Sequence, residues 1–231
     1  MIGIIVAAGR AKRMKNKCKA LIKVNGEPII EHIIKNMIPL VKKIIIIVHG
    51  NEIQKAIGDD YLNTPIVYIQ QKHRKGIAHA IYQCKRKIDE NMLIILGDII
   101  YRGNLTELKV SFELDIRKFD FIFGVQDVED KNLIKKSYGI LEEMPMKVIE
   151  KPLDSDLDSL LPALGLGIYM ATPKLFDYIK QTKPNERTGE IEFTDTINVI
   201  PSNLCGFKNL KGFYINVNTE EDLKNANNNS I

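Results

Sequence analysis

The stretch IGIIVAAGRAKRMKNKCK, residues 2–19, decides which fold and which chemistry this chain can have. It opens with the apolar run Ile2–Val6 and passes through Ala7, Ala8 and Gly9. Lys or Arg then occupies six of the ten positions 10–19. A short apolar run that ends near a glycine predicts a buried strand. Open α/β sheets bind their ligands at the carboxyl ends of such strands, so the cationic segment lies where a ligand is expected.

The segment after this strand has the composition of a phosphate-binding loop. Small residues let the backbone approach an anion closely, and successive N–H groups in such a loop can cradle phosphate oxygens. The cations that follow can neutralise a triphosphate. We therefore expect phosphate contacts from Ala7, Ala8, Gly9, Lys12 and Arg13, and a solvated surface loop is the alternative.

Short apolar runs recur along the chain between amphipathic stretches, and this alternation predicts an α/β fold. The sheet should be mainly parallel and covered by helices on both faces, because most of the runs are continuously apolar. The expected strands are residues 2–6, 44–48, 66–69, 92–96 and 119–125. The expected helices are residues 28–37, 77–88 and 173–180, the last capped by Thr172 with Pro173 at its first position. Shorter strands at 138–141, 148–149 and 164–170 predict a β-rich lid or second wall.

Composition excludes several classes of protein. With 45% hydrophobic and 27% charged residues, the chain should fold into a compact α/β domain. The net charge of +4 is spread along the chain, which suits small anionic ligands better than nucleic acid. Three widely spaced cysteines argue against a disulfide framework or a thiolate zinc site, and the longest aliphatic run, Ile44–Val48, is too short to span a membrane. We expect a cytoplasmic protein without a membrane partner.

The cationic loop and its continuation resemble a known family. Residues 9–14 (GRAKRM), Lys19 and residues 24–29 (VNGEPI) are similar to the G-x-G-[TS]-R-[ML], P-K and V-x-G-x-P-[LI] signature of sugar-phosphate nucleotidyltransferases. The resemblance implies that Arg13 contacts the triphosphate and Lys19 the reacting phosphates. Ala11, Lys12 and Cys18 depart from the signature, in which Gly, Thr or Ser, and Pro are usual.

Two further motifs of the first half follow in the family's order. Residues 71–81 (QKHRKGIAHAI) resemble the Q-x4-G-T-A-x-A-I element that holds the nucleobase, which implies base contacts from Gln71, Gly76 and Ile77. Gln71 would offer an amide acceptor and an amide donor to the base edge. Gly97 and Asp98 resemble the G-D-x-x-[YF] element, in which the aspartate coordinates a catalytic magnesium ion. Mg2+ is therefore the expected cofactor, although a turn cap is the alternative role for an aspartate after a strand.

The second half carries motifs that resemble the family's sugar-binding elements Y-G, E-K-P, G-x-Y and G-E-x-E-x-T-D. The resemblance implies sugar contacts from Tyr138, Gly139, Glu150, Lys151, Gly167, Tyr169 and Glu190. Lys151 would also bind the sugar phosphate and is expected, with Arg13, Lys19 and Asp98, to be catalytic. A surface ion pair is the alternative for Glu150 and Lys151.

One departure from the family's motifs falls on a residue that coordinates the metal in the family. Residues 212–223 (GFYINVNTEEDL) resemble G-x-W-x-D-x-G-T-x-x-D-L, so Asn216 stands where the family has its second metal-binding aspartate. A neutral amide oxygen can still coordinate magnesium, but it contributes no charge. We expect a weaker metal site made of Asp98 and Asn216.

The resemblance extends through Leu223 and implies one Rossmann-like domain of the nucleotide-diphospho-sugar transferase type, in a short form without an appended C-terminal domain. Residues 1–130 would form a nucleotide-binding half, 131–223 a sugar-binding half and 225–231 a frayed tail. The implied reaction joins a sugar 1-phosphate, glucose 1-phosphate above all, to dTTP or UTP and releases pyrophosphate. The alternatives are a cytidylyl- or guanylyltransferase for another phosphorylated alcohol and a non-catalytic nucleotide-sugar-binding protein. The resemblance also leaves a homo-oligomer open.

Overall fold

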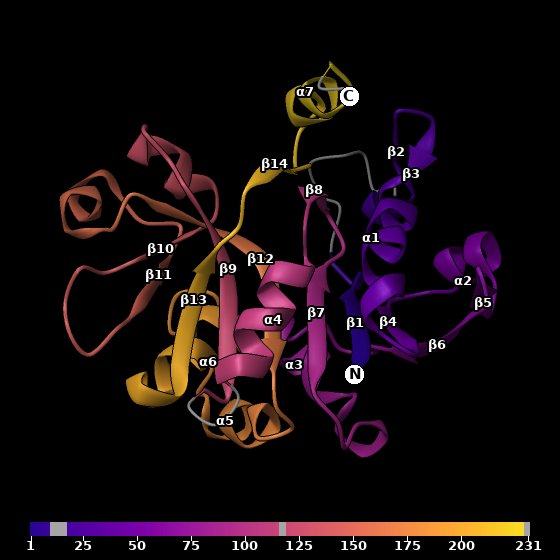
Figure 1. The fold of residues 1–231 in the computed structure, drawn as a ribbon, viewed down its shortest axis with the longest axis horizontal. Helices are drawn as coiled ribbons and strands as arrows, with labels where there is room; N and C mark the ends of the chain where they lie inside the picture. Colours follow the sequence, from indigo (N-terminus) through magenta and orange to yellow (C-terminus); the bar gives the residue numbers. More distant parts are fainter. Residues whose placement is uncertain (10–17, 116–118, 229–231) are drawn as a thin grey trace.

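An eight-stranded sheet runs through the centre of the molecule, with strands in the order β13-β9-β12-β7-β1-β4-β6-β5 (Figure 1). The computed structural model describes residues 1–9, 18–115 and 119–228. The strands of this sheet are β1 (Ile2–Val6), β4 (Ile44–Val48), β5 (Asp60–Tyr61), β6 (Thr64–Gln70), β7 (Met92–Leu96), β9 (Phe121–Asp127), β12 (Ala163–Ala171) and β13 (Cys205–Asn209). Three predicted strands have the expected bounds, and the strands predicted at 66–69 and 119–125 differ from β6 and β9 by one or two residues at each end.

The pairing confirms a mostly parallel sheet. Strand β1 is parallel to both β4 and β7, β4 is parallel to β6, and β13 is parallel to β9. Strand β12 lies antiparallel between β7 and β9, and the short edge strand β5 is antiparallel to β6. The parallel strands at the centre therefore present their carboxyl ends along one edge, where the sequence places the phosphate loop.

Helices cover both faces, as the continuously apolar strands predicted. The helices are α1 (Ile29–Met37), α2 (Glu52–Ile57), α3 (Ile77–Tyr82), α4 (Thr106–Asp115), α5 (Leu175–Gln181), α6 (Phe193–Val199) and α7 (Glu220–Asn228). Short 3-10 helices span Lys19–Leu21, Ile38–Leu40, Lys85–Lys87, Lys131–Lys136, Asp154–Ser159 and Ser202–Leu204. Within the described ranges, no helix combines the length and the apolarity that crossing a membrane requires.

Alternate residues of each strand contribute to two separate cores. Ile44 and Ile46 pack in a core with residues of α1 and α4, whereas Ile45 and Ile47 pack in a second core with residues of α3, α5 and α6. This is the two-residue period of a strand that is buried on both faces.

Three small sheets surround the carboxyl edge. They pair β2 (Lys23–Val24) with β3 (Glu27–Pro28), β8 (Ile99–Gly103) with β14 (Gly212–Asn216), and β10 (Tyr138–Ile140) with β11 (Val148–Glu150). The β8–β14 ribbon brings the end of the chain back to the strand that follows Asp98 (Figure 1). The β10–β11 hairpin confirms that the second half is rich in short strands.

Three local predictions were wrong. The helix predicted at 77–88 ends at Tyr82, because the backbone N–H groups of Gln83 and Cys84 bond three residues back and tighten the last turn. The helix predicted from Pro173 begins at Leu175, and the Thr172 hydroxyl lies 3.4 Å from a carboxylate oxygen of Asp120 instead of capping the helix.

The predicted tail was the third error, because residues 225–228 belong to α7. Ala226 is buried, and Asn227 accepts a hydrogen bond of 2.7 Å from the backbone N–H of Asn25. These contacts with the β2–β3 hairpin order a segment that its composition alone did not predict to be ordered.

The close contact between β1 and β7 depends on Gly97. A Cβ at this position would lie 2.9 Å from the Cα and Cβ atoms of Ala7 and from the carbonyl oxygen of Val6. We predict that Gly97→Ala lowers the free energy of unfolding by about 1–3 kcal/mol through overpacking, measured by urea denaturation.

Gly9→Ala is the matched control, because its added Cβ meets nothing within 4 Å among the described residues. It should change stability by no more than about 0.5 kcal/mol. Equal effects of the two substitutions would contradict the assigned role of Gly97.

Candidate active site

The predicted phosphate and metal residues meet at the carboxyl ends of β1 and β7. The two strands pair in register, with Val6 opposite Leu96, so Ala7 and Gly97 leave the sheet side by side. The N–H of Gly97 donates to the carbonyl of Val6 at 3.0 Å. Ala8 is buried and Gly9 is exposed. The predicted cations Lys12 and Arg13 lie outside the described residues.

Lys19 is a described cation that reaches this edge. The 3-10 helix Lys19–Leu21 positions its side chain, whose Nζ lies 3.3 Å from Oδ2 of Asp98 and 2.5 Å from Oδ1 of Asn218. The Lys19 side chain is 20% exposed and that of Asp98 is 28% exposed, so the pair is partly accessible to solvent. This contact brings together two predicted catalytic residues that are far apart in the sequence.

The turn that follows β14 places Asn218 beside this ion pair. The N–H of Val217 donates to the carbonyl of Asp98 at 2.8 Å, which fixes the end of β14 against the strand junction. Oδ2 of Asp222 accepts from the N–H groups of Asn218 and Thr219, and Oγ1 of Thr219 accepts from the N–H of Asp222. This reciprocal capping rigidifies the turn and holds Asn218 against Lys19.

The side chain of Asn216 has an unusual environment. Its Oδ1 is buried and accepts no hydrogen bond from the described residues. Buried polar atoms in folded proteins are nearly always paired, so an orphan acceptor at a site edge suits a ligand donor or a cation.

The donor set fits a weakly held magnesium ion. Within the described part of the chain, no group of three or more His, Cys, Asp or Glu side chains could hold a metal. Magnesium, however, usually takes only one or two protein carboxylates together with water and substrate phosphates. One carboxylate, Asp98, and the unpaired amide oxygen of Asn216 match that requirement.

Two predicted sugar-site tyrosines of the second half, Tyr138 and Tyr169, pack against each other. The rings of Tyr138 and Tyr169 stack with centroids 6.3 Å apart, and the hydroxyl of Tyr138 is buried without a partner among the described residues. Burial, then the carboxylates of Asp98 and Glu150, raise the pKa of Tyr214. Tyr214 therefore lies within electrostatic range of both carboxylates, and the sequence motifs assigned it no role.

Glu150 and Lys151 lie at the end of β11. Their charged groups are 3.4 Å apart, with Glu150 30% exposed and Lys151 61% exposed. Burial raises the pKa of Glu150 in spite of its lysine partner, and the nearby Glu192 carboxylate raises it further. The structure thus places Glu192 near Glu150, whereas Glu190, predicted from the same motif, is exposed and forms no salt bridge within the described residues.

The backbone of Lys151 is in the left-handed region, with φ of 47°. Its N–H donates to the carbonyl of Ser137 at 2.7 Å, which holds this conformation. A non-glycine residue in this region before a proline is strained, and such strain clusters at functional sites. The backbone conformation therefore favours a functional role for Lys151 over an incidental surface pair.

The predicted sugar-site glycines have packing roles as well. Gly167, with φ of +70°, lies in the irregular part of β12 between Gly165 and Tyr169. A Cβ on Gly139 would lie 2.7 Å from the side chain of Leu160. Both glycines therefore allow close packing against leucine side chains, since a Cβ on Gly167 would lie 2.9 Å from Leu96.

The predicted base-binding element lies further along the same edge. Gln71 follows β6 and is only 4% exposed. Its amide nitrogen lies 3.1 Å from the carbonyl oxygen of Gly76, and its contact with a base stays a prediction. Gly76 has φ of +100°, and a Cβ there would lie 2.4 Å from the carbonyl oxygen of Ile191. Ile77, at the start of α3, is partly exposed.

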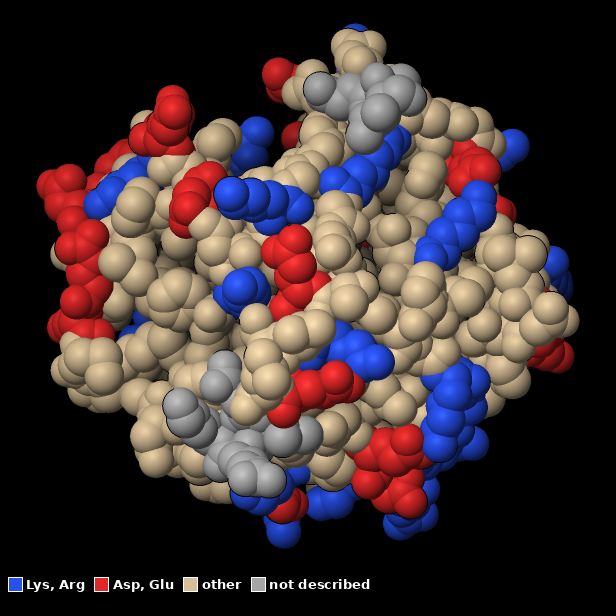
Figure 2. Space-filling model, viewed as in Figure 1, with Lys and Arg blue, Asp and Glu red and all other residues tan. Residues whose placement is uncertain are grey.

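Charges on the surface are mixed. On the face seen in Figure 2, Lys and Arg side chains are interspersed with Asp and Glu, as the even spread along the sequence suggested.

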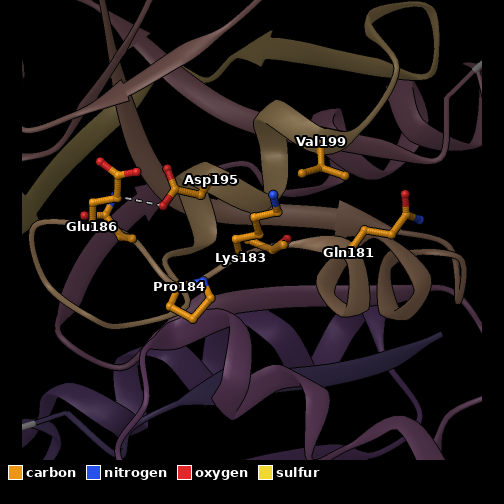
Figure 3. A pocket seen from close by; sticks show the side chains of 8 residues that line it. Gln181, Lys183, Pro184, Glu186, Asp195 and Val199 are labelled. Atoms are coloured by element: carbon orange, nitrogen blue, oxygen red, sulfur yellow. Dashed lines mark hydrogen bonds between the residues drawn. The ribbon is translucent and has the colours of Figure 1, made fainter.

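A separate surface hollow of about 410 Å³ is lined by residues 181–186 with Asp195 and Val199 (Figure 3). None of the predicted site residues lines it.

Comparison with known proteins agrees with this geometry. Residues 3–107 match the model of the MobA-like NTP transferase domain. These residues form a MobA-like NTP transferase domain. The match spans the strands that carry Ala7, Gln71 and Asp98, and the predicted resemblance to sugar-phosphate nucleotidyltransferases is confirmed.

Individual relatives cover more of the chain. The bifunctional protein GlmU of Methanococcus maripaludis is 31% identical over 99% of this chain, which spans 54% of that relative's length. The UTP–glucose-1-phosphate uridylyltransferase AglF of Haloferax volcanii is 28% identical, over 87% of this chain and 83% of that protein.

Solved structures share the whole fold. A Bacillus anthracis protein assigned as a glucose-1-phosphate thymidylyltransferase superposes with a TM-score of 0.85 and 25% identity, covering 99% of this chain and 94% of that one. A UDP-glucose pyrophosphorylase complexed with UDP-glucose superposes with a TM-score of 0.83. The MobA-like domain and the second half therefore form the nucleotide-diphospho-sugar transferase fold that the motifs implied.

The raised pKa of Glu150 gives a testable pH dependence. Burial favours its neutral form in the folded state, so its contribution to stability is complete below its unfolded pKa of about 4.3 and is lost as the pH rises through the folded pKa. Glu150→Gln removes this titration. We predict that the unfolding free energy of the variant, relative to the unsubstituted protein, increases from pH 4 to pH 7.

Urea denaturation at several pH values measures this difference. Glu190→Gln, in the same half of the chain but exposed, is the control and should show less pH dependence. A relative stability of Glu150→Gln that falls between pH 4 and pH 7 would show that the ion pair with Lys151 outweighs burial.

Proposed function

We propose that this chain is a nucleotidyltransferase that joins a sugar 1-phosphate to a nucleoside triphosphate and releases pyrophosphate. The observation that carries the proposal is the cluster at the ends of β1 and β7. There Lys19 contacts Asp98 while the buried amide oxygen of Asn216, at the adjoining end of β14, lacks a partner. The cluster has the cation and oxygen ligands that phosphate groups and a divalent ion require.

The reaction needs positioning more than proton transfer. An oxygen of the sugar phosphate attacks the α-phosphorus, a new P–O bond forms, and the bond from the α-phosphorus to the bridging oxygen breaks. Pyrophosphate leaves with that electron pair. A phosphate monoester is mostly a dianion near neutral pH because its second pKa is about 6, so the attack needs no general base.

Lysine side chains in both halves of the chain would supply the charge and alignment that this step requires. Lys19, held by Asp98 and Asn218, would neutralise phosphate oxygens at the strand ends. Lys151, whose backbone is strained, would hold the sugar phosphate for in-line attack. Arg13 and Lys12 remain proposed triphosphate ligands from the sequence motif.

Magnesium is the proposed cofactor, with Asp98 and Asn216 as its protein ligands. When bound, the ion would neutralise phosphate charge and help to orient the two substrates. Because Asn216 is neutral, the substrate phosphates would provide most of the negative charge around it.

The relatives favour particular substrates. AglF is named as acting on UTP and glucose 1-phosphate, and the Bacillus anthracis protein as acting on glucose 1-phosphate. We therefore take glucose 1-phosphate with UTP or dTTP as the proposed pair. A cytidylyl- or guanylyltransferase remains the alternative within the class.

The partners and the compartment of the enzyme are proposed from its composition and its family. Its partners would be the two small anionic substrates, without nucleic acid or membrane, and a homo-oligomer is compatible with the family. The three cysteines are all free, which fits the reducing cytoplasm proposed for it.

Pyrophosphate release tests the proposed function directly. Purified protein with Mg2+ and glucose 1-phosphate is given UTP, dTTP, CTP, GTP or ATP in turn. We predict release with UTP or dTTP, and a loss of about 100-fold or more in Asp98→Ala, because the carboxylate anchors the site electrostatically.

Asp158→Ala, at an exposed position in the second half, is the control and should retain full activity. No release with any nucleotide, together with retained binding of UDP-glucose, would instead support the non-catalytic binding protein that Asn216 suggests.

Asn216→Asp tests the metal ligand. A second carboxylate should lower the Mg2+ concentration for half-maximal activity by about tenfold, in line with one added charge at close range. It should also make the melting temperature depend more strongly on Mg2+, because two nearby carboxylates repel one another until a cation binds. Asn203→Asp, at an exposed position in the 3-10 helix Ser202–Leu204, is the matched control and should change neither quantity. An unchanged metal dependence in Asn216→Asp would remove this residue from the metal site.

A further inference from the structure

The buried side chain of Gln71 is held in one place by two contacts. Its amide nitrogen lies 3.1 Å from the carbonyl oxygen of Gly76 and 3.1 Å from Nδ1 of His79, on the first turn of α3. Its own backbone is fixed as well, since its N–H donates to Val48 and its carbonyl oxygen lies 3.0 Å from Nδ1 of His49. The position of this amide is therefore set by the protein before any ligand arrives.

The contact with Gly76 also determines which end of the Gln71 amide is the NH2 group and which is the oxygen. A backbone carbonyl can only accept a hydrogen bond, so the group that faces it must be the amide NH2. The second hydrogen of that NH2 then points to His79, whose Nδ1 must act as the acceptor. A neutral imidazole with its proton on Nε2 satisfies this requirement.

The surroundings of His79 favour that neutral ring. Burial, with the nearby positive charge of Lys75 and with His73, lowers the pKa of His79. The amide nitrogen of Gln83 lies 3.2 Å from Nε2 of His79. The same amide nitrogen lies 3.2 Å from the carbonyl oxygen of His79, so it is the NH2 group. Since Gln83 is exposed, its side chain can turn away from the ring and leave the Nε2 proton to water, whereas Gln71 is buried.

Both amide hydrogens of Gln71 are thus used within the protein, and its Oε1 is the polar atom left for a ligand. Uracil and thymine carry an N–H at ring position 3, which can donate to such an oxygen. Cytosine carries an unprotonated nitrogen there, which is itself an acceptor. Two acceptors facing each other in a buried site leave both unpaired, and this penalty is larger than that of a missing contact.

We propose that His79 is a positioning residue that holds the Gln71 amide with its oxygen toward the base and thereby selects a pyrimidine nucleotide with a ring N–H over one without. This inference rests on the proposed function, because it concerns the base of the triphosphate that the site would take. His79 falls at the unspecified position of the Q-x4-G-T-A-x-A-I element, so the motif itself gives it no role.

A matched pair of substitutions tests this role. In His79→Asn the side-chain oxygen can accept from Gln71 near the place of Nδ1, whereas His79→Leu has the same branching without an acceptor. For each full-length variant, kcat/KM is measured with UTP and with CTP against glucose 1-phosphate, and calorimetry gives the Kd of each nucleotide. Circular dichroism and the melting temperature confirm that both variants fold.

We expect His79→Asn to keep the preference for UTP. In His79→Leu, kcat/KM with UTP divided by kcat/KM with CTP should fall about tenfold, and so should the corresponding ratio of affinities. One hydrogen bond that orients the Gln71 amide is then lost, so the amide can turn its NH2 toward cytosine. An unchanged ratio in folded His79→Leu would overturn the proposal. An equal loss with both nucleotides would overturn it as well, since a purely structural role predicts that result.

Calorimetry keeps this test separate from the proposed function. If the unsubstituted protein releases no pyrophosphate, the proposed transferase activity fails. A binding preference for UTP over CTP that disappears in His79→Leu would then still support the orienting role of His79.

Discussion

The parallel pairing of β1 with β7 is the constraint on which the site depends. It places the ends of both strands side by side, and the absence of a side chain at Gly97 lets the backbone of Ala7 approach within contact distance. Asp98 therefore emerges next to the phosphate loop. Val217 then docks on the carbonyl of Asp98, which anchors the last strand and the asparagine turn at the same point. Backbone hydrogen bonds join the nucleotide-binding half to the end of the chain at this point.

Much of this arrangement could be predicted from sequence, because buried parallel strands have a strong signal. The runs Ile2–Val6, Ile44–Val48 and Met92–Leu96 are continuously or nearly continuously apolar, and each forms a strand with the expected bounds. Once these strands are assigned, the edge that carries Ala7, Gln71 and Asp98 follows from the direction of the chain. The proximity of Lys19 to Asp98 required the family resemblance, since 79 residues separate them.

The rest depended on tertiary contacts with no local signal. Thr172 has the side chain of a helix cap, but its hydroxyl faces Asp120, a carboxylate brought near by β9. Gln71 was expected to offer a donor to the base, whereas Gly76 and His79 already take its amide hydrogens. The polar sequence of residues 225–228 suggested a frayed end, but packing against β2 orders it. In each case a partner distant in sequence, or a competing hydrogen bond, decided the outcome.

The charge balance at the strand ends constrains how ligands can arrive. Among the described residues there, Asp98 is the one carboxylate in contact with Lys19, and Asn216 and Asn218 add only neutral amides. A divalent ion would bind only weakly without a nucleotide, because Lys19 already offsets the charge of Asp98 and would repel a second cation. The oxygens of a triphosphate change this balance, since they can bind Lys19 and the ion together. The site that this geometry describes would therefore bind its metal with the nucleotide, and the neutral Asn216 would suffice as a ligand because most of the negative charge comes from the substrate.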